Sequence, residues 1–132
     1  MVAHRKVKIL LSTAVIAVLL LGGAYVGWKV RKGMVVRAAF TAGNAAYERG
    51  DWETARRMLG RYVSVHPEDV DVLFKYARAQ LSVRPLPQGN VRQAMGAYRQ
   101  LLRARPGDES AFRRLALLYE TTGNLAELQY IA

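Results

Sequence analysis

The sequence predicts an all-α protein, in which an N-terminal transmembrane helix is followed by an α-solenoid of helix-turn-helix repeats. Two observations lead to this prediction. Residues 9–28 form a run of twenty residues without a charge. Three tripeptides of Gly, Asp or Asn and a large apolar residue then recur at intervals of 39 and 34 residues, namely Gly50-Asp51-Trp52, Gly89-Asn90-Val91 and Gly123-Asn124-Leu125. The run matches the thickness of a bilayer core, and the intervals are those of stacked helical repeats. With 132 residues, the chain has room for one modest domain and an appendage.

The net charge of +10 is concentrated near the N-terminus. No acidic residue precedes Glu48, and from Val36 onward 14 basic residues face 10 acidic ones, an excess of only +4. The remaining excess flanks the apolar run, on Arg5, Lys6, Lys8, Lys29, Arg31 and Lys32. We therefore expect the charge to border a membrane segment and expect no nucleic-acid partner.

The first 35 residues are predicted to form a basic tail (1–8), a transmembrane anchor (9–28) and a basic connector (29–35). Twenty helical residues rise about 30 Å, which spans a hydrocarbon core. Ser12 and Thr13 can return their hydrogen bonds to the helix backbone, and Tyr25 and Trp28 suit an interfacial aromatic belt. A short tail before such an anchor favours a cytoplasmic N-terminus, with the repeats on the periplasmic side of a bacterial inner membrane.

Two other interpretations of the apolar run remain open. One is a cleaved secretory signal, with an apolar stretch from Ile9 to Leu21 and small residues at Gly22 and Ala24. The other is a buried core helix, which would need a larger protein around it.

The repeats are predicted from three turns, at Gly50-Asp51, Gly89-Asn90 and Gly123-Asn124. Glycine accepts the left-handed conformation that ends a helix, and the next Asp or Asn can cap the following helix. Gln93 and Glu127 lie three residues after Asn90 and Asn124, as in a capping box. Each of the first two glycines is followed seventeen residues later by a proline, Pro67 or Pro106, predicted to end the second helix of a pair. The acids Glu68, Asp69, Asp108 and Glu109 then favour the start of the next helix.

Apolar and small residues between the turns recur at helical spacing. Ala39, Ala42, Gly43 and Ala46 share one predicted face, as do Phe112, Leu115, Ala116 and Tyr119. The small residues Gly43, Ala55, Ala77, Ala94 and Ala116 would let paired helices approach closely.

This pattern resembles the tetratricopeptide repeat family, whose unit is two antiparallel helices in 34 residues. The resemblance covers residues 36–132 and implies repeats at 36–69, 70–108 and 109–132, the last incomplete. Repeat two carries five extra residues, placed at Arg84–Gln88, which are a longer surface turn or a loop that overhangs a binding surface. Tyr62 and Leu101 replace the small residue usual late in the second helix. The family's fold implies a concave groove that holds peptides or partner helices.

The resemblance carries the groove positions of the family to the first helix of each repeat. We expect partner contacts above all from Arg37, Phe40, Asn44, Tyr47, Phe74, Arg78, Leu81, Arg113 and Leu117. Further family groove positions are Glu48, Asp71, Ser110 and Glu120. For each residue the alternative is a solvated helix face or packing between repeats. Because Phe40 occupies the place of the essential lysine, a clamp for chaperone carboxylates is not expected.

Nothing in the sequence suggests catalysis, a metal or a cofactor. The chain has two histidines, His4 and His66, and no cysteine. His66 precedes Pro67 and is interpreted as a turn residue rather than a ligand. The arginines Arg92, Arg99, Arg103 and Arg105 on one predicted second helix are more typical of a soluble face than of a phosphate site.

The predicted function is that of a membrane-anchored protein-interaction scaffold in bacterial cell-envelope organisation or assembly. One alternative is the targeting or regulatory front of a longer enzyme, and another is a cationic binder of membrane surfaces or nucleic acid. Apolar residues at Leu125, Leu128, Tyr130 and Ile131 would leave the last repeat open, so we also expect self-association through this C-terminal edge or its continuation by further chain.

Overall fold

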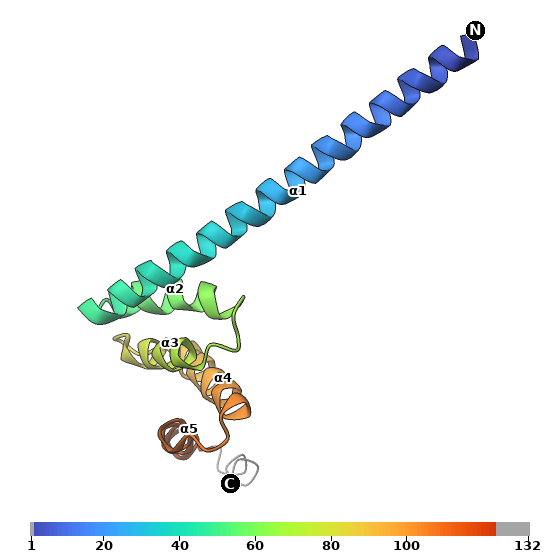
Figure 1. Ribbon diagram of the computed structural model, residues 1–132. Helices are drawn as coiled ribbons and strands as arrows, with labels where there is room; N and C mark the ends of the chain where they lie inside the picture. The colour runs from blue at the N-terminus through green and yellow to red at the C-terminus, as the bar shows by residue number, and fades with distance from the viewer. Residues whose placement is uncertain (1, 124–132) are drawn as a thin grey trace. The chain divides into compact units, whose positions relative to one another are not determined.

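The computed structural model describes residues 2–123 and contains five α-helices in this range, with no strand (Figure 1). They are α1 (Val2–Arg49), α2 (Trp52–Val63), α3 (Val70–Ser82), α4 (Gln88–Ala104) and α5 (Glu109–Thr122). The all-α prediction is confirmed. The chain divides into two units, Met1–Val35 and Val36–Ala132, and α1 contributes residues to both.

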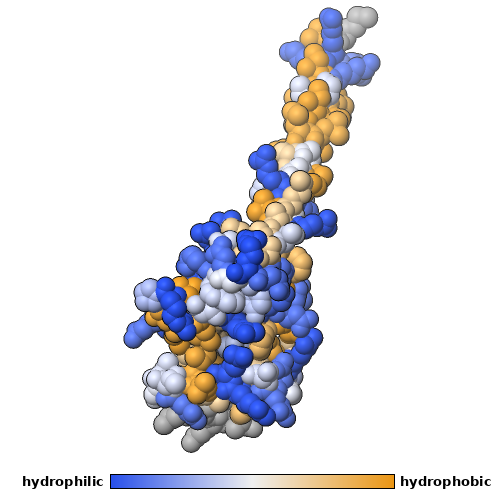
Figure 2. All heavy atoms as spheres, turned by 90° about the vertical axis from the view of Figure 1, so that its left-hand side faces the viewer, coloured by the Kyte–Doolittle hydropathy of each residue, from blue (hydrophilic) through white to orange (hydrophobic). Residues whose placement is uncertain are grey.

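The first unit consists of helical residues of α1 that are all exposed. Its apolar surface lies between hydrophilic residues at both ends (Figure 2). Ser12 and Thr13 donate to the Ile9 carbonyl at 2.9 and 3.0 Å, as predicted. The Tyr25 and Trp28 ring centroids lie 6.3 Å apart. Within the described residues, α1 alone is long and apolar enough to cross a membrane, a test that a signal sequence also passes.

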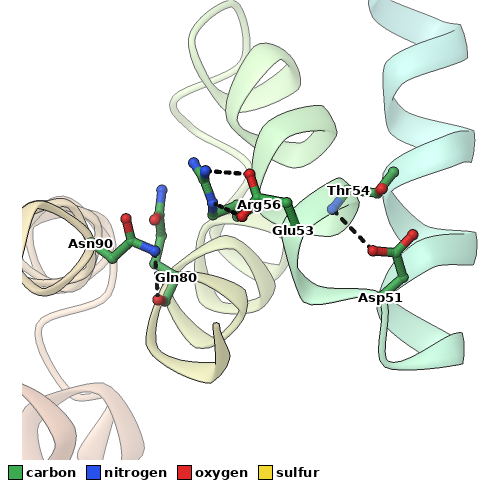
Figure 3. Close-up of polar contacts among 6 residues, drawn as sticks. All are labelled: Asp51, Glu53, Thr54, Arg56, Gln80 and Asn90. Carbon is green, nitrogen blue, oxygen red and sulfur yellow. Dashed lines mark hydrogen bonds and ion pairs between the residues drawn. The ribbon is translucent and has the colours of Figure 1, made fainter. Parts of the chain in front are cut away.

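The turn at Gly50 forms as predicted. Gly50 has φ +72°, and the Thr54 N–H donates to the Asp51 carboxylate at 3.2 Å, so Asp51 caps α2 (Figure 3). The side-chain and backbone hydrogen bonds of Thr54 lower the pKa of Asp51. This turn joins the first and second helices of repeat one.

The turn predicted at Gly89 is wrong in position. Helix α4 already begins at Gln88, after Pro87 in an extended conformation, so Gly89 and Asn90 lie inside the first helical turn. Asn90 is buried, and its Nδ2 donates to the Gln80 carbonyl of α3 at 3.2 Å instead of capping α4 (Figure 3). The five-residue insert explains the shift, because Pro87 is fixed near the backbone geometry that precedes a helix. Gln93 accordingly accepts from the Tyr76 hydroxyl, at 3.5 Å, and forms no capping box.

The turns between repeats use the predicted acids. The Asp69 and Asp108 carboxylates accept from the Val72 and Ala111 N–H groups at 3.2 and 3.0 Å and cap α3 and α5. Pro67 and Pro106 lie just beyond the ends of α2 and α4. Gly123 has φ +75° and ends α5 as predicted. The cap at Asn124, Glu127 and the apolar edge from Leu125 to Ile131 lie outside the described residues.

The core lies between successive helices of the second unit. Its largest fully buried side chains are Leu59, Leu73, Tyr98, Leu101, Leu115 and Tyr119. A Cβ built on Gly43 would lie 2.7 Å from the Leu59 Cδ2, so this glycine permits the close approach of α1 and α2. Ala42 is exposed and Ala116 half-buried, contrary to the predicted faces, whereas Ala55, Ala77 and Ala94 are fully buried.

The two unusual bulky residues have clear roles. Leu101 is 1% exposed and fills the core. The Tyr62 hydroxyl donates to Asp69 Oδ2 at 3.0 Å, so it links the end of α2 to the residue that caps α3.

Candidate protein-interaction surface

The first helices of the three repeats are α1 from Val36, α3 and α5. We call the exposed and half-buried side chains on these helices the first-helix surface. Every residue that the sequence analysis assigned to a groove belongs to it. Asn44, Tyr47, Phe74 and Leu81 are half-buried, and the others are exposed, namely Arg37, Phe40, Glu48, Asp71, Arg78, Ser110, Arg113, Leu117 and Glu120.

Lys75 joins repeats one and two on this surface. Its Nζ donates to Asn44 Oδ1 at 2.7 Å, lies 4.0 Å from Glu48 Oε1 and stands 5.5 Å from the Tyr47 ring centroid. Asn44 Nδ2 also donates to the Phe40 carbonyl at 2.9 Å. Both ends of the Asn44 amide are therefore engaged within the chain, which leaves this residue poorly suited to hold a ligand carboxylate.

The aromatic residues of repeat one also pack within the domain. Tyr47 meets Trp52 edge-on, with ring centroids 5.4 Å apart. Phe40 and His66 lie on Tyr62, each with a centroid distance of 4.8 Å. Burial and the hydrogen bond to Asp69 raise the pKa of Tyr62. The aromatic stack fixes the Phe40 end of the surface, although Phe40 itself keeps 37% of its area exposed.

A second junction links repeats two and three around Tyr98 of α4. The Phe74 ring meets Tyr98 edge-on at 5.9 Å, and the Arg114 guanidinium lies 5.5 Å from the Phe74 ring centroid. Tyr98 is fully buried. Its hydroxyl oxygen has no hydrogen bond of standard geometry in the described part of the chain, although the Arg114 side chain lies close enough to help lower the Tyr98 pKa by hydrogen bonding. Burial raises the pKa of Tyr98, while the nearby charges of Arg114 and Arg78 lower it. The hydroxyl thus lies within the electric field of two arginines on different repeats.

The other predicted residues vary in their surroundings. Arg113 pairs with Glu109 at 3.2 Å, and Asp71 pairs with Arg105 at 3.4 Å. Leu81 packs against the core, whereas Leu117 remains 59% exposed. Leu117 therefore offers an accessible apolar side chain on α5.

Two residues of the junctions, Lys75 and Arg114, were not predicted. Both are the sixth residue of their helix, counted from Val70 in α3 and Glu109 in α5. The family positions carried across include the preceding residue, Phe74 or Arg113, but not this one. The recurrence of a basic side chain one residue later in both repeats was the available signal.

Comparisons with known proteins support the repeat assignment. Family models described as tetratricopeptide repeat match residues 36–79 and 86–127. A mutant of MamA has 21% sequence identity and a TM-score of 0.61, with coverage of 73% of this chain and 53% of that chain. MamA MSR-1 has 20% identity and a TM-score of 0.58, with coverage of 73% and 52%. MamA AMB-1 has 21% identity and a TM-score of 0.61, with coverage of 73% and 50%.

The likeness to MamA is one of fold, and this chain spans about half the length of these structures. The comparison with curated proteins gave no match. The repeats and the fold support a role in protein–protein interaction. From its two repeat matches, its turns and its helix pairing, the chain belongs to the tetratricopeptide repeat family.

Proposed function

We propose that the protein is a membrane-anchored scaffold that binds a partner protein on its first-helix surface. The observation that carries the proposal is the row of accessible aromatic, aliphatic and arginine side chains on three consecutive first helices. Phe40, Arg78 and Leu117 are exposed on α1, α3 and α5 respectively. Aromatic residues and arginine are enriched among residues that dominate binding energy, and helical repeats use the extended surface of stacked first helices for this purpose.

The proposed anchor is residues 9–28, in a bacterial inner membrane, with the repeats in the periplasm. The exposed apolar side chains of α1 and the basic residues on both sides of them support it. Confinement to a membrane raises the effective concentration of the repeats toward other membrane-associated proteins. This setting suits organisation or assembly of the cell envelope, and the proposal assigns the chain no catalytic role.

Site-specific photo-crosslinking tests the binding surface. A photoreactive amino acid is placed at Leu117 or Arg78 of the full chain in cells, and at Arg103 on the second helix α4 as the control. We expect the same partner to be captured from both first-helix positions and not from position 103. The Arg78→Glu substitution, with crosslinking from position 117, should reduce the yield. Failure of both first-helix positions to capture a specific protein, or equal capture from position 103, contradicts the proposal.

Cysteine labelling tests the orientation. The chain contains no cysteine, so Ser110→Cys on α5 and Val2→Cys in the N-terminal tail each give a single reactive thiol. In intact spheroplasts, a membrane-impermeant maleimide should label position 110 and spare position 2. The reverse pattern places the repeats in the cytoplasm. The mass of the mature chain then separates an anchor from a cleaved signal, because cleavage near Ala24 removes most of the proposed anchor.

A further inference from the structure

We infer that the repeats carry a second interaction surface, an arginine stripe on α4 that binds a bilayer surface rich in anionic phospholipid headgroups. The arginine stripe consists of Arg92, Arg99 and Arg103. The inference rests on the proposed function only in that the chain is held near membranes. It uses no side chain of the first-helix surface.

The first argument is the alignment of the three arginines. They lie seven and four residues apart on α4, so at about 100° per residue their side chains leave the helix within about 40° of one another. The stripe extends along about 16 Å of the helix, and all three residues are exposed. A straight row of this kind presents its charges to an extended anionic surface rather than to a single point.

The second argument is the separation of charge between helices. The 17 residues of α4 contain no acidic residue, so no side chain of this helix neutralises the stripe. Arg105, which follows α4, pairs with Asp71 and is not part of the stripe. The exposed acids of the first helices lie instead on α1, α3 and α5, namely Glu48, Asp71, Glu109 and Glu120. Helix α4 thus presents charge of one sign, which attracts an anionic surface.

The third argument is the composition of the exposed face of α4. Its exposed residues include no large apolar side chain and are Gln88, Arg92, Gln93, Arg99, Arg103 and Ala104. Protein interfaces depend on a buried apolar or aromatic centre, which this face does not supply. A layer of phosphate groups needs no such centre, because arginine binds phosphate through parallel N–H groups. The face therefore suits headgroups better than a partner protein.

A hollow beside the stripe gives a headgroup room to enter. It has a volume of about 570 Å³ and is lined by residues of α4 and α5. Arg92 and Arg99 both line it, Gln88 adds an amide, and no described lining residue is acidic. Tyr119 lines it as well, and its buried hydroxyl has no hydrogen-bond partner in residues 2–123. Two guanidinium groups and an unused hydroxyl suit the phosphate and alcohol oxygens of a phosphatidylglycerol headgroup.

The test uses the full chain in nanodiscs of phosphatidylcholine. These are mixed with separate vesicles of phosphatidylcholine, either alone or with an equal amount of phosphatidylglycerol. Incorporation into the nanodiscs, seen by gel filtration, tests the anchor, whereas co-flotation with the vesicles tests the stripe, so the two can fail separately. We expect co-flotation with the anionic vesicles only. It should be lost as the salt concentration approaches roughly 0.5 M, because salt screens exposed charges.

Charge removal tests the stripe itself. Each substitution of a stripe arginine by glutamine should weaken binding to the anionic vesicles about threefold to fivefold, and the triple variant by about tenfold or more. The matched control removes three arginines from the first helices, by Arg78→Gln, Arg113→Gln and Arg114→Gln, and should change binding less than about twofold. The urea transition of each variant, read from Trp52 fluorescence on a Trp28→Phe background, verifies that the repeats remain folded.

A fluorescent probe locates the contact. The chain has no cysteine. Gly96 lies between Arg92 and Arg99 in sequence and has no atom within 4 Å of a built Cβ, so Gly96→Cys gives an accessible thiol for a fluorophore. Anionic vesicles that carry a spin-labelled headgroup should quench this fluorophore and spare one attached at Ser110→Cys on α5.

Three results overturn the inference. Equal co-flotation with neutral and anionic vesicles would show that anionic headgroups are not recognised. Equal losses in the stripe triple variant and the control triple variant, or stronger quenching at position 110 than at position 96, would show that binding is spread over the basic surface. Tighter binding of a polyglutamate peptide than of the vesicles, abolished in the stripe variants, would make the partner an acidic protein segment.

Discussion

Two tyrosines of the second unit, Tyr62 and Tyr98, differ in whether the hydroxyl group forms a hydrogen bond. Tyr62 donates to Asp69 at 3.0 Å, whereas Tyr98 is fully buried with no partner in the described residues. Both have a raised pKa, in each case chiefly because burial disfavours the phenolate. Removal of the hydroxyl therefore removes a hydrogen bond at Tyr62 and an unpaired buried polar group at Tyr98.

We predict that Tyr98→Phe stabilises the repeats by about 1 kcal/mol, because it removes a buried unpaired hydroxyl. Tyr62→Phe, the matched control, should destabilise them by about 1 kcal/mol through loss of the Asp69 hydrogen bond. Urea unfolding followed by Trp52 fluorescence measures both. Destabilisation by Tyr98→Phe equal to that by Tyr62→Phe would mean that the Tyr98 hydroxyl is paired in solution.

The same residue predicts a pH dependence. Since the folded-state pKa of Tyr98 lies above its ordinary value of 10.0, the stability that depends on its neutral form is complete below pH 10. It is lost as the pH rises further, because the unfolded state releases the proton first. We expect the loss of stability as the pH rises above the ordinary tyrosine pKa of 10.0 to be shallower in Tyr98→Phe than in the parent chain. Identical slopes would contradict this assignment.

At the residue scale, the resemblance to the family assigned partner contacts to first-helix positions, and this assignment stays a prediction. Arg78 and Leu117 are exposed, whereas Leu81 packs against the core. The assignment did not show which of these positions other side chains occupy. Asn44 is engaged by Lys75, and Arg113 by Glu109. The Lys75–Asn44 contact forms only when the repeats stack, whereas Arg113–Glu109 is an i,i+4 pair within α5. Contacts between repeats are not visible in family spacing, so Lys75 and Arg114 were missed.

At the scale of single elements, glycine has different roles at different turns and contacts. Gly50 adopts φ +72° at the end of α1, but Gly89 lies within α4 and has no positive φ. Gly43 lies against Leu59, while Gly96 has no atom within 4 Å of a built Cβ. The recurring Gly-Asn pair predicted helix pairing correctly and the second turn incorrectly, since the prolines of the insert provide a turn that spacing alone does not reveal.

The two turn glycines should respond oppositely to alanine. Gly50→Ala forces a side chain into the left-handed region and should cost about 1 kcal/mol. Gly89→Ala should be neutral or stabilising by up to about 1 kcal/mol, because alanine favours helix and space is available there. The midpoint of the Trp52 urea transition measures both. A large loss of stability in Gly89→Ala would indicate that Gly89 lies in the turn and would contradict the start of α4 at Gln88.

A second pair of glycines tests the close approach of α1 and α2. A Cβ at Gly43 would lie 3.0 Å from the Leu59 backbone nitrogen as well as against its side chain, and Leu59 is 0% exposed. We expect Gly43→Ala to destabilise by about 1–2 kcal/mol, since overpacking exceeds the gain in helix propensity. Gly96→Ala in α4 should instead stabilise by up to about 1 kcal/mol. If Gly43→Ala and Gly96→Ala stabilise the protein equally, α1 and α2 can move apart to accept the methyl group without loss of stability.

At the scale of the whole molecule, the chain contains two units that differ in where their apolar residues lie. In the first, the apolar residues of α1 are exposed, whereas the second buries its own core between α2, α3, α4 and α5. Composition predicted this division, because a run of uncharged residues without helical periodicity cannot pack in a small repeat domain. The partner and the membrane side depend on other molecules, so no feature of one chain determines them.

The division predicts that the second unit folds without the first. A chain that begins at Gly33 keeps every core residue from Ala39 onward and should give the same Trp52 urea midpoint as the full chain. The full chain should remain with membranes after alkaline carbonate extraction, because about 30 Å of apolar helix is inserted, whereas the shortened chain should be released. Leu19→Arg with Val15→Arg, which places two charges in the apolar run, should release the full-length chain as well. Release of the unmodified full chain would remove the anchor. A lower midpoint in the chain from Gly33 would show instead that the N-terminal segment contributes to the stability of the repeats.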